Sequence, residues 1–176
     1  MYELILKAAD YAARQHRDQR RKDAEASPYI NHPIAVARIL SEAGIDDPVV
    51  LAAAILHDTI EDTTTTPDDL RQRFDDRIAS IVVEVTDDKS LEKARRKELQ
   101  VEHAPHLSEA AALVKFADKI ANLTDILESP PPWTPERKAA YFAWARTVVV
   151  RLPVQHARLR ERFDALQARG PAVSTP

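Results

Sequence analysis

One helix-start signature occurs three times along this chain: a residue that caps a helix, followed at once by proline. Asp47-Pro48, Thr66-Pro67 and Thr134-Pro135 each introduce a run of residues suited to a helix. Proline is tolerated at the first helical position, and the Asp or Thr oxygen accepts a hydrogen bond from a free backbone N–H there. Gly44 suits the opposite end, because helices often end at a glycine with left-handed backbone. The chain is therefore predicted to be a series of helices.

Apolar spacing points to the same fold class. Apolar residues recur three and four positions apart over most of the chain, which places them on one face of a helix. On this spacing we predict helices around residues 4–13, 34–40, 48–58, 113–123, 141–152 and 154–167. The stretch 48–58 is apolar almost all round, so its helix should be central and buried. Residues 81–86 have strand propensity, but a lone strand would lack a partner, and we predict a helix there too.

The predicted fold class is therefore all-α, a single helical bundle. We expect one domain over residues 1–170, because a chain of 176 residues with 44% apolar residues can build one sizeable core. A flexible tail is expected over residues 171–176, after Gly170.

Composition excludes several classes of protein. With only two glycines, the chain cannot build a glycine-rich phosphate loop, and without cysteine it has no disulfide, zinc-thiolate site or cysteine nucleophile. A net charge of -3 does not favour nucleic acid as a partner. No apolar stretch approaches the roughly 18 to 20 residues of a membrane span, and the N-terminus lacks a signal-peptide pattern. We therefore expect no membrane partner and a cytoplasmic location.

The pair His57-Asp58 stands at the end of the most apolar stretch. Neighbouring helical side chains point about 100° apart, so both can reach one ion only beyond the end of the helix. Further ligands must come from other helices, and the candidates are His32, before Pro33, and Asp118, inside an otherwise apolar helix. Two imidazoles and two carboxylates suit a divalent ion such as Mn²⁺, with Zn²⁺, Fe²⁺ or Co²⁺ as alternatives.

Each candidate ligand also has a structural interpretation. His32 could cap a helix or pack in the core, and Asp118 could pair with Lys115 or Lys119. A buried carboxylate is costly unless it is paired or binds a metal. The coincidence of four such residues, each on or beside an apolar helix, favours the metal site. The remaining histidines lie in charged surroundings, and we expect most of them at the surface: His16, His103, His106 and His156.

Glu61 and Asp62 lie one helical turn beyond His57 and Asp58. A carboxylate beside a bound cation can accept the proton of an attacking water, so both acids are candidate catalytic residues. The alternative is that they only cap the following threonine-rich loop. We favour the catalytic interpretation.

Two basic runs, at residues 17–23 and 89–97, could meet an anionic substrate. Such runs are more often solvated helix ends. The first lies only about ten residues before His32, however, so Arg21 and Lys22 could bind phosphate at the metal, as guanidinium and ammonium groups do well.

Five motifs occur in a familiar order. The chain contains Ala9-Asp10-Tyr11-Ala12-Ala13-Arg14, Pro28-Tyr29-Ile30-Asn31-His32-Pro33, Leu56-His57-Asp58-Thr59-Ile60-Glu61-Asp62-Thr63, Glu84-Val85-Thr86-Asp87-Asp88-Lys89 and Lys115-Phe116-Ala117-Asp118-Lys119. Over roughly residues 5 to 150 it resembles the HD-domain hydrolases of guanosine tetraphosphate (ppGpp), the hydrolase half of RelA/SpoT proteins. The length and the segment at 141–144 are most similar to the stand-alone small alarmone hydrolases, including the metazoan SpoT homolog.

The resemblance implies an all-helical HD-domain fold and an activity. The expected reaction removes the 3′-pyrophosphate of ppGpp or pppGpp and leaves GDP or GTP. The implied ligands of a Mn²⁺ ion are His32, His57, Asp58 and Asp118. Glu61 and Asp62 are implied to position or activate the water, and the residues matching the nucleotide site are Arg21, Lys22 and Asn122. No synthetase domain is expected.

Three points stay open in the sequence. Thr124 stands where the family often has arginine, which leaves one basic contact in question. Related pockets could accept another nucleotide, so a different HD-superfamily phosphohydrolase is an alternative. A non-hydrolysing module that binds the alarmone is the other, although retained water-handling acids argue against it. The sequence predicts no oligomeric state.

Overall fold

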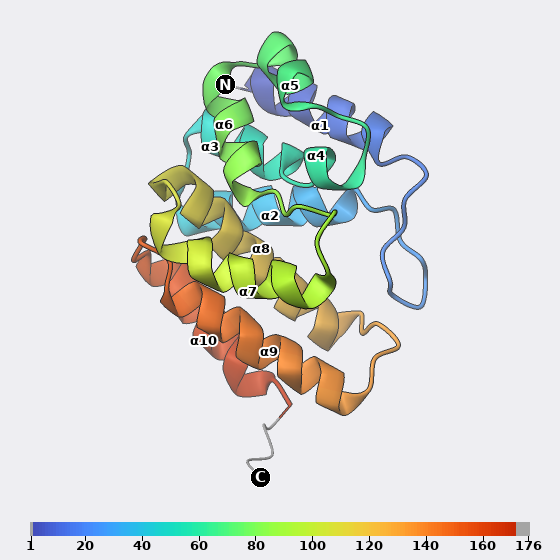
Figure 1. Ribbon diagram of the computed structural model, residues 1–176, viewed down its shortest axis with the longest axis vertical. Helices are drawn as coiled ribbons and strands as arrows, with labels where there is room; N and C mark the ends of the chain where they lie inside the picture. The colour runs from blue at the N-terminus through green and yellow to red at the C-terminus, as the bar shows by residue number, and fades with distance from the viewer. Residues whose placement is uncertain (1, 172–176) are drawn as a thin grey trace.

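The computed structural model describes residues 2–171, and its helices are labelled in Figure 1. In chain order they are α1 Tyr2–Gln15, α2 Asn31–Ala43, α3 Pro48–Leu56, α4 Thr59–Asp62, α5 Pro67–Arg73, α6 Asp76–Val85, α7 Lys93–His103, the 3-10 helix η1 Ala104–His106, α8 Glu109–Glu128, α9 Pro135–Val150 and α10 Ala157–Arg169. Within residues 2–171 every regular element is helical, apart from one isolated bridge between Arg20 and Pro28. The all-α prediction is confirmed. The expected tail lies outside the described residues, except for Pro171.

Local capping signals fix the helix ends as predicted. Asp47 accepts a hydrogen bond from the Val49 N–H at 2.8 Å, and Thr66 forms a capping box with Asp69. Gly44 ends α2 with φ 94°, a left-handed conformation that glycine adopts without strain. The strand-prone stretch 81–86 is helical as far as Val85, the last residue of α6, which confirms the helix prediction.

Helix α3 is the central helix that the sequence predicts. All its residues from Val49 to Leu56 are buried, and it packs against α1, α2 and α6. Ala52, Ala53 and Ala54 are fully buried, and the facing side of α1 presents Ala8 and Ala12. Small side chains on both surfaces let two helices approach closely. The segment after Leu56 is therefore held at a fixed place in the core.

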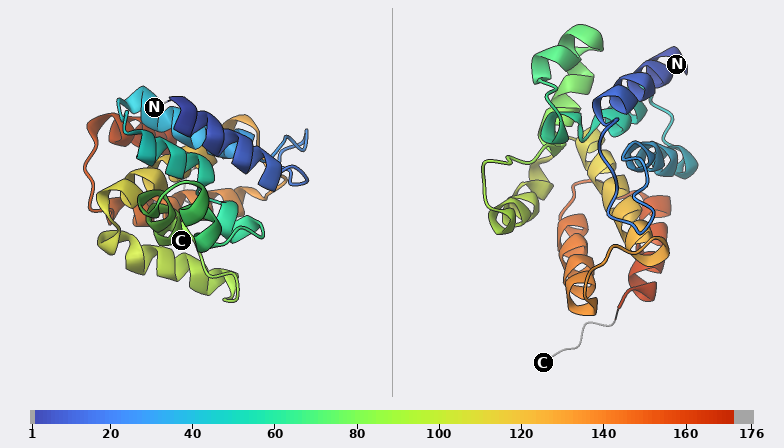
Figure 2. Two further views of the ribbon diagram at one scale, coloured as in Figure 1. Left: turned by 90° about the horizontal axis from the view of Figure 1, so that it is seen from above. Right: turned by 90° about the vertical axis from the view of Figure 1, so that its right-hand side faces the viewer.

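Helix α8 joins the two halves of the molecule. It runs between the α1–α6 region and the α9–α10 pair, as the views in Figures 1 and 2 show. Its residues pack on α2 on one side and α10 on the other. Phe116 of α8 meets Phe163 of α10 edge to face, with ring centroids 5.8 Å apart. No helix among the described residues is long and apolar enough to cross a membrane.

Replacing Phe163 with alanine should destabilise the whole domain. The ring is fully buried, so its loss leaves a cavity between α8 and α10 that costs about 3 to 5 kcal/mol of unfolding free energy. Urea denaturation measures this change. The control is Val150→Ala, because that side chain is 60% exposed and its truncation should alter stability by only about 0.5 kcal/mol. Equal effects of the two substitutions would contradict the assigned packing of α10.

Candidate active site

The helix is interrupted after α3, and the resulting turn forms the centre of the site. The helix ends at Leu56, two residues earlier than predicted, and Asp58 has φ -96° and ψ -2° before α4 begins. The Thr59 hydroxyl donates to the Leu56 carbonyl at 2.7 Å and so occupies an oxygen at the helix end. Because of this turn His57 and Asp58 converge instead of diverging by 100°: His57 Nε2 lies 3.0 Å from Asp58 Oδ2.

Two other helices bring the remaining candidate ligands to the same point. His32, near the start of α2, places Nε2 3.2 Å from Asp118 Oδ1 on α8 and 3.8 Å from Asp58 Oδ2. One ligand atom each of His32, His57 and Asp118 lies within 4.8 Å of the others. Both histidines are buried. The structure therefore brings together the four residues that the sequence proposes as ligands, and their role stays a prediction.

The hydrogen bonds of His57 show that this donor set fits a cation. Its Nδ1 lies 2.8 Å from the Ala54 carbonyl, which can only accept, so Nδ1 carries the proton. The buried Nε2 has no hydrogen-bond partner among residues 2–171 and faces carboxylate oxygens. A lone pair facing carboxylates is unfavourable unless a positive charge lies between them. A divalent cation meets this requirement, with the ring held in place by its backbone contact.

The raised pKa of His57 also indicates that this position favours a positive charge. Burial alone would lower the pKa of His57, but the charges of Asp58 and Asp118 raise it to about 9. Without a metal, the cluster therefore attracts a proton to the position that a cation would take.

Asp118 has partners on both of its oxygens. Oδ1 accepts a hydrogen bond from Asn122 at 2.6 Å, in addition to facing His32, and Oδ2 lies 3.0 Å from Lys119 Nζ. Pairing with Lys119 therefore occurs alongside convergence on the histidines. Lys115 instead donates to the Val85 carbonyl at 2.8 Å. Burial acts to raise the pKa of Asp118, but Lys119 and His32 hold it well below its usual range.

Glu61 and Asp62 line the cavity of about 190 Å³ that contains the four candidate ligands. Glu61 Oε2 accepts the Asp87 N–H at 3.1 Å, and Arg96 Nη1 lies 3.6 Å from its other oxygen. Burial raises the pKa of Glu61 to about 7, although the Asp87 N–H acts against this. The carboxyl group can therefore exchange a proton near neutral pH. Asp62 is held by Lys89 on one oxygen.

Tyr29 links a candidate ligand to a candidate catalytic acid. Its hydroxyl lies 2.7 Å from Asp58 Oδ2 and 3.1 Å from Asp62 Oδ2, so a single proton is shared between two carboxylates. Tyr29 belongs to one of the sequence motifs, but sequence reasoning gave it no role. Tyr29 lies three residues before the candidate ligand His32, and this spacing could have identified it as a neighbour of the site.

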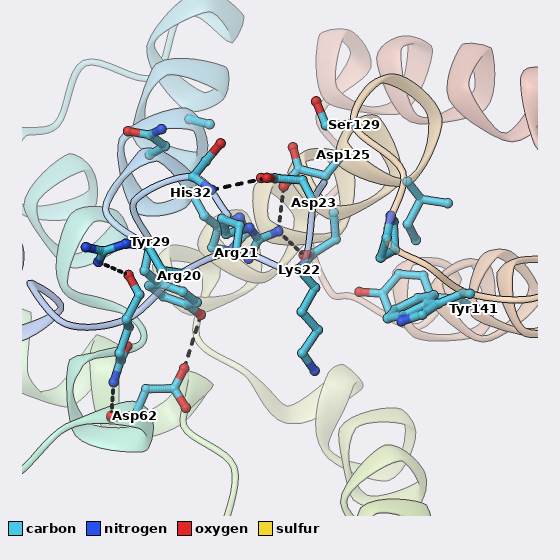
Figure 3. A pocket seen from close by; sticks show the side chains of 18 of the residues that line it. Arg20, Arg21, Lys22, Asp23, Tyr29, His32, Asp62, Asp125, Ser129 and Tyr141 are labelled. Carbon is cyan, nitrogen blue, oxygen red and sulfur yellow. Dashed lines mark hydrogen bonds and ion pairs between the residues drawn. The ribbon is translucent and has the colours of Figure 1, made fainter. Parts of the chain in front are cut away.

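The predicted nucleotide-binding residues line a larger pocket of about 690 Å³ next to this cavity. Arg21, Lys22 and Asn122 all face it, and the close-up in Figure 3 labels the first two. Arg21 Nη2 donates to Asp125 Oδ2 at 2.5 Å and to Asn122 Oδ1 at 3.3 Å. Sequence reasoning missed Asp125 and Tyr141. Asp125 could have been found, because positions 118, 122 and 125 share one face of α8.

We predict most of the remaining histidines at the surface, but His16 is buried. Its side chain is only 1% exposed, its Nδ1 lies 2.7 Å from Gln19 Oε1, and its ring packs on Tyr29 with centroids 4.8 Å apart. The charged neighbours in sequence point outward, while the ring turns under the loop that carries Arg21. His103 and His106 are exposed as predicted, and His156 is half-buried.

Comparisons with known proteins show which family this chain belongs to. A family model described as "HD domain" matches residues 8–143. Human guanosine-3′,5′-bis(diphosphate) 3′-pyrophosphohydrolase MESH1 is 56% identical over 164 residues, which cover 92% of each protein. The Drosophila melanogaster protein of the same name is 47% identical with the same coverage. A solved structure described as "A metazoan ortholog of SpoT hydrolyzes ppGpp and plays a role in starvation responses" superposes with a TM-score of 0.91 at 46% identity, over 96% of this chain and 97% of that one.

The matched region contains α2, α4, α8 and the turn between α3 and α4, which together supply the four candidate ligands and both candidate catalytic acids. The similarity to the MESH1 proteins extends over nearly the full length of both partners. The chain therefore belongs to the HD-domain family and, within it, to the group of the MESH1 proteins.

Proposed function

We propose that this chain is a guanosine-3′,5′-bis(diphosphate) 3′-pyrophosphohydrolase that converts ppGpp to GDP and pppGpp to GTP. The observation that carries the proposal is 56% identity, over 92% of both chains, to a human relative with that activity in its name. The buried cluster of two histidines and two aspartates supports it. The single domain expected over residues 1–170 would carry the whole site.

The reaction divides one molecule of water between two products. The bond between O3′ and the adjacent phosphorus breaks, the water oxygen joins that phosphorus to give pyrophosphate, and O3′ takes a proton. A divalent cation held by His32, His57, Asp58 and Asp118 would supply Lewis acidity towards the phosphate and the water. We propose Mn²⁺, because the mixed nitrogen and oxygen donor set suits it.

Glu61 is the better placed of the two acids to accept the proton of the water. Its pKa is raised by burial to about 7, close to the value that makes a carboxylate an effective base at neutral pH. Asp62 has both oxygens engaged, by Lys89 and by Tyr29. Asp62 is therefore assigned to orienting the water and Tyr29 to positioning Asp58 and Asp62.

The activity is tested directly by incubating the purified chain with ppGpp. Mn²⁺ should give equal amounts of GDP and pyrophosphate, EDTA should abolish turnover, and added Mn²⁺ should restore it. Parallel reactions with Zn²⁺, Fe²⁺ and Co²⁺ test the choice of metal. A metal-loaded protein that binds ppGpp tightly and leaves it intact would indicate a binding module. Turnover of a different nucleotide only would indicate another phosphohydrolase.

Replacing Glu61 with glutamine should reduce kcat by roughly 10²- to 10⁴-fold and leave the bound metal unchanged. In the unmodified protein the rate should rise with pH and level off at or below about pH 7, because Glu61 must lose its proton and a cation would lower its pKa. The variant should lack this rise. Glu84→Gln is the matched control, since Glu84 also accepts a backbone N–H, from Ser108 at 2.7 Å, without facing the ligand cluster. A normal pH profile in the Glu61 variant would rule out this role.

Replacing Tyr29 with phenylalanine should weaken Mn²⁺ binding roughly 10- to 100-fold, because Asp58 loses the hydrogen bond that orients it. Titration calorimetry measures the affinity. Tyr11→Phe removes a comparable hydroxyl contact, to Thr65 at 3.1 Å, and should leave the affinity unchanged. Asp58→Ala should abolish binding. Unaltered affinity in the Tyr29 variant would show that its hydroxyl does not position the ligand.

A further inference from the structure

His16 is a buried histidine that the proposed mechanism does not use. It borders neither the large pocket nor the cavity beside it, so any effect on a reaction there must pass through other residues. Its Nε2 has no hydrogen-bond partner among residues 2–171. Packing alone therefore gives no reason for an imidazole at this place, because a phenyl ring would avoid burying that nitrogen.

The other ring nitrogen of His16 is engaged with Gln19. The side-chain Nε2 of Gln19 donates to the backbone carbonyl of Asp62, which can only accept. The amide oxygen of Gln19 therefore faces His16, and His16 Nδ1, 2.7 Å away, must carry the proton. Two consecutive hydrogen bonds thus lead from His16 through Gln19 to Asp62.

The backbone of Gln19 is itself held in place. Its N–H donates to the His16 carbonyl at 2.9 Å, and its carbonyl accepts the Tyr29 N–H at 3.1 Å. The remaining freedom lies in the side-chain torsion angles, and the hydrogen bond from His16 fixes the orientation of the amide. An amide turned the other way would place its oxygen against the Asp62 carbonyl, where two acceptors repel each other.

Helix α4 depends on such outside contacts because it is only one turn long. Its N–H groups at Asp62 and Thr63 bond back to Asp58 and Thr59, and a helix of four residues is not stable on such bonds alone. The Asp62 carbonyl, at the end of α4, has no donor within the helix. Gln19, 43 residues earlier in the chain, supplies that donor. The backbone that carries the Asp62 carboxylate is therefore held by the segment after α1.

The ring of His16 makes a second contact, with Tyr29. The two ring centroids are 4.8 Å apart, and the Tyr29 hydroxyl in turn contacts Asp58 and Asp62. A phenyl ring at position 16 would keep this packing and lose the hydrogen bond to Gln19. An asparagine would do the reverse, because its Nδ2 takes the place of the imidazole Nδ1. Substitution can therefore separate the two contacts.

We propose that His16 is a positioning residue for the hydrolysis and acts through Gln19 on Asp62. The inference rests on the proposed function for the role of Asp62, which orients the attacking water. The hydrogen bond from His16 fixes the Gln19 amide, the amide fixes the end of α4, and α4 fixes the Asp62 carboxylate.

The variant His16→Phe tests the hydrogen bond with the ring contact kept. Its kcat for ppGpp should fall roughly 10- to 100-fold with KM within about threefold of normal, because a misplaced catalytic group costs rate. Its melting temperature should stay within about 4 °C of normal. A residue that only stabilises the fold would give the reverse, a lower melting temperature with normal kcat. His16→Asn, assayed where it is folded, should keep kcat within about threefold of normal because the donor is restored.

A second substitution tests the route through Gln19. Gln19→Ala should lower kcat as His16→Phe does, and the double variant should be no slower than Gln19→Ala alone, since both changes remove one path. The matched control is His156→Phe, which should keep normal kcat: His156 also has a ring nitrogen without a partner in residues 2–171 and borders neither pocket. Additive losses, or a faster Phe than Asn variant at position 16, would overturn the inference.

Hydrogen exchange separates this inference from the proposed function, because it needs no substrate. In His16→Phe the amides of Asp62 and Thr63 should exchange at least about tenfold faster than in the unmodified protein, with exchange in α8 unchanged. Faster exchange in a chain that does not hydrolyse ppGpp would support the positioning and reject the function. Unchanged exchange would overturn the inference, and hydrolysis of ppGpp by the unmodified chain would then still support the function.

Discussion

The turn at His57 and Asp58 is the constraint on which the site depends. A continuous helix would direct these two side chains about 100° apart, whereas the break after Leu56 places His57 Nε2 and Asp58 Oδ2 3.0 Å apart. The turn is useful only if its position is fixed, because two more ligands arrive from α2 and α8. The fully buried helix α3 supplies that fixed position. The geometry of the site therefore depends on the packing of α3 in the core.

The parts of the structure that the sequence predicts are those decided by neighbouring residues. The caps at Asp47 and Thr66 act within three residues, and apolar spacing identifies the buried face of each helix. The four candidate ligands were found the same way, because polar residues at the edge of apolar helices are conspicuous. The early end of α3 was missed, since it depends on whether the Thr59 hydroxyl turns back to the Leu56 carbonyl.

The parts that the sequence did not predict depend on contacts between distant segments. His16 looks like a surface residue from its charged neighbours, but the loop after α1 turns it under Tyr29. The double contact of Tyr29 with Asp58 and Asp62 likewise requires residues 29 and 33 positions apart in the chain. Thr124, where the family often has arginine, donates its hydroxyl to the Ile120 carbonyl of its own helix and borders neither the large pocket nor the cavity beside it.

Net charge is a poor guide to what this pocket binds. The chain carries a net charge of -3, and acids such as Asp23 and Asp125 line the pocket that we propose for a polyanion. Each of these acids is already engaged: Asp23 accepts the backbone N–H groups of Glu25 and Ser27, and Asp125 pairs with Arg21. Charges that are already paired add little field at a distance, whereas unpaired cations act on an arriving ligand in full. Under the proposed function, these paired acids would therefore oppose an arriving polyanion only weakly.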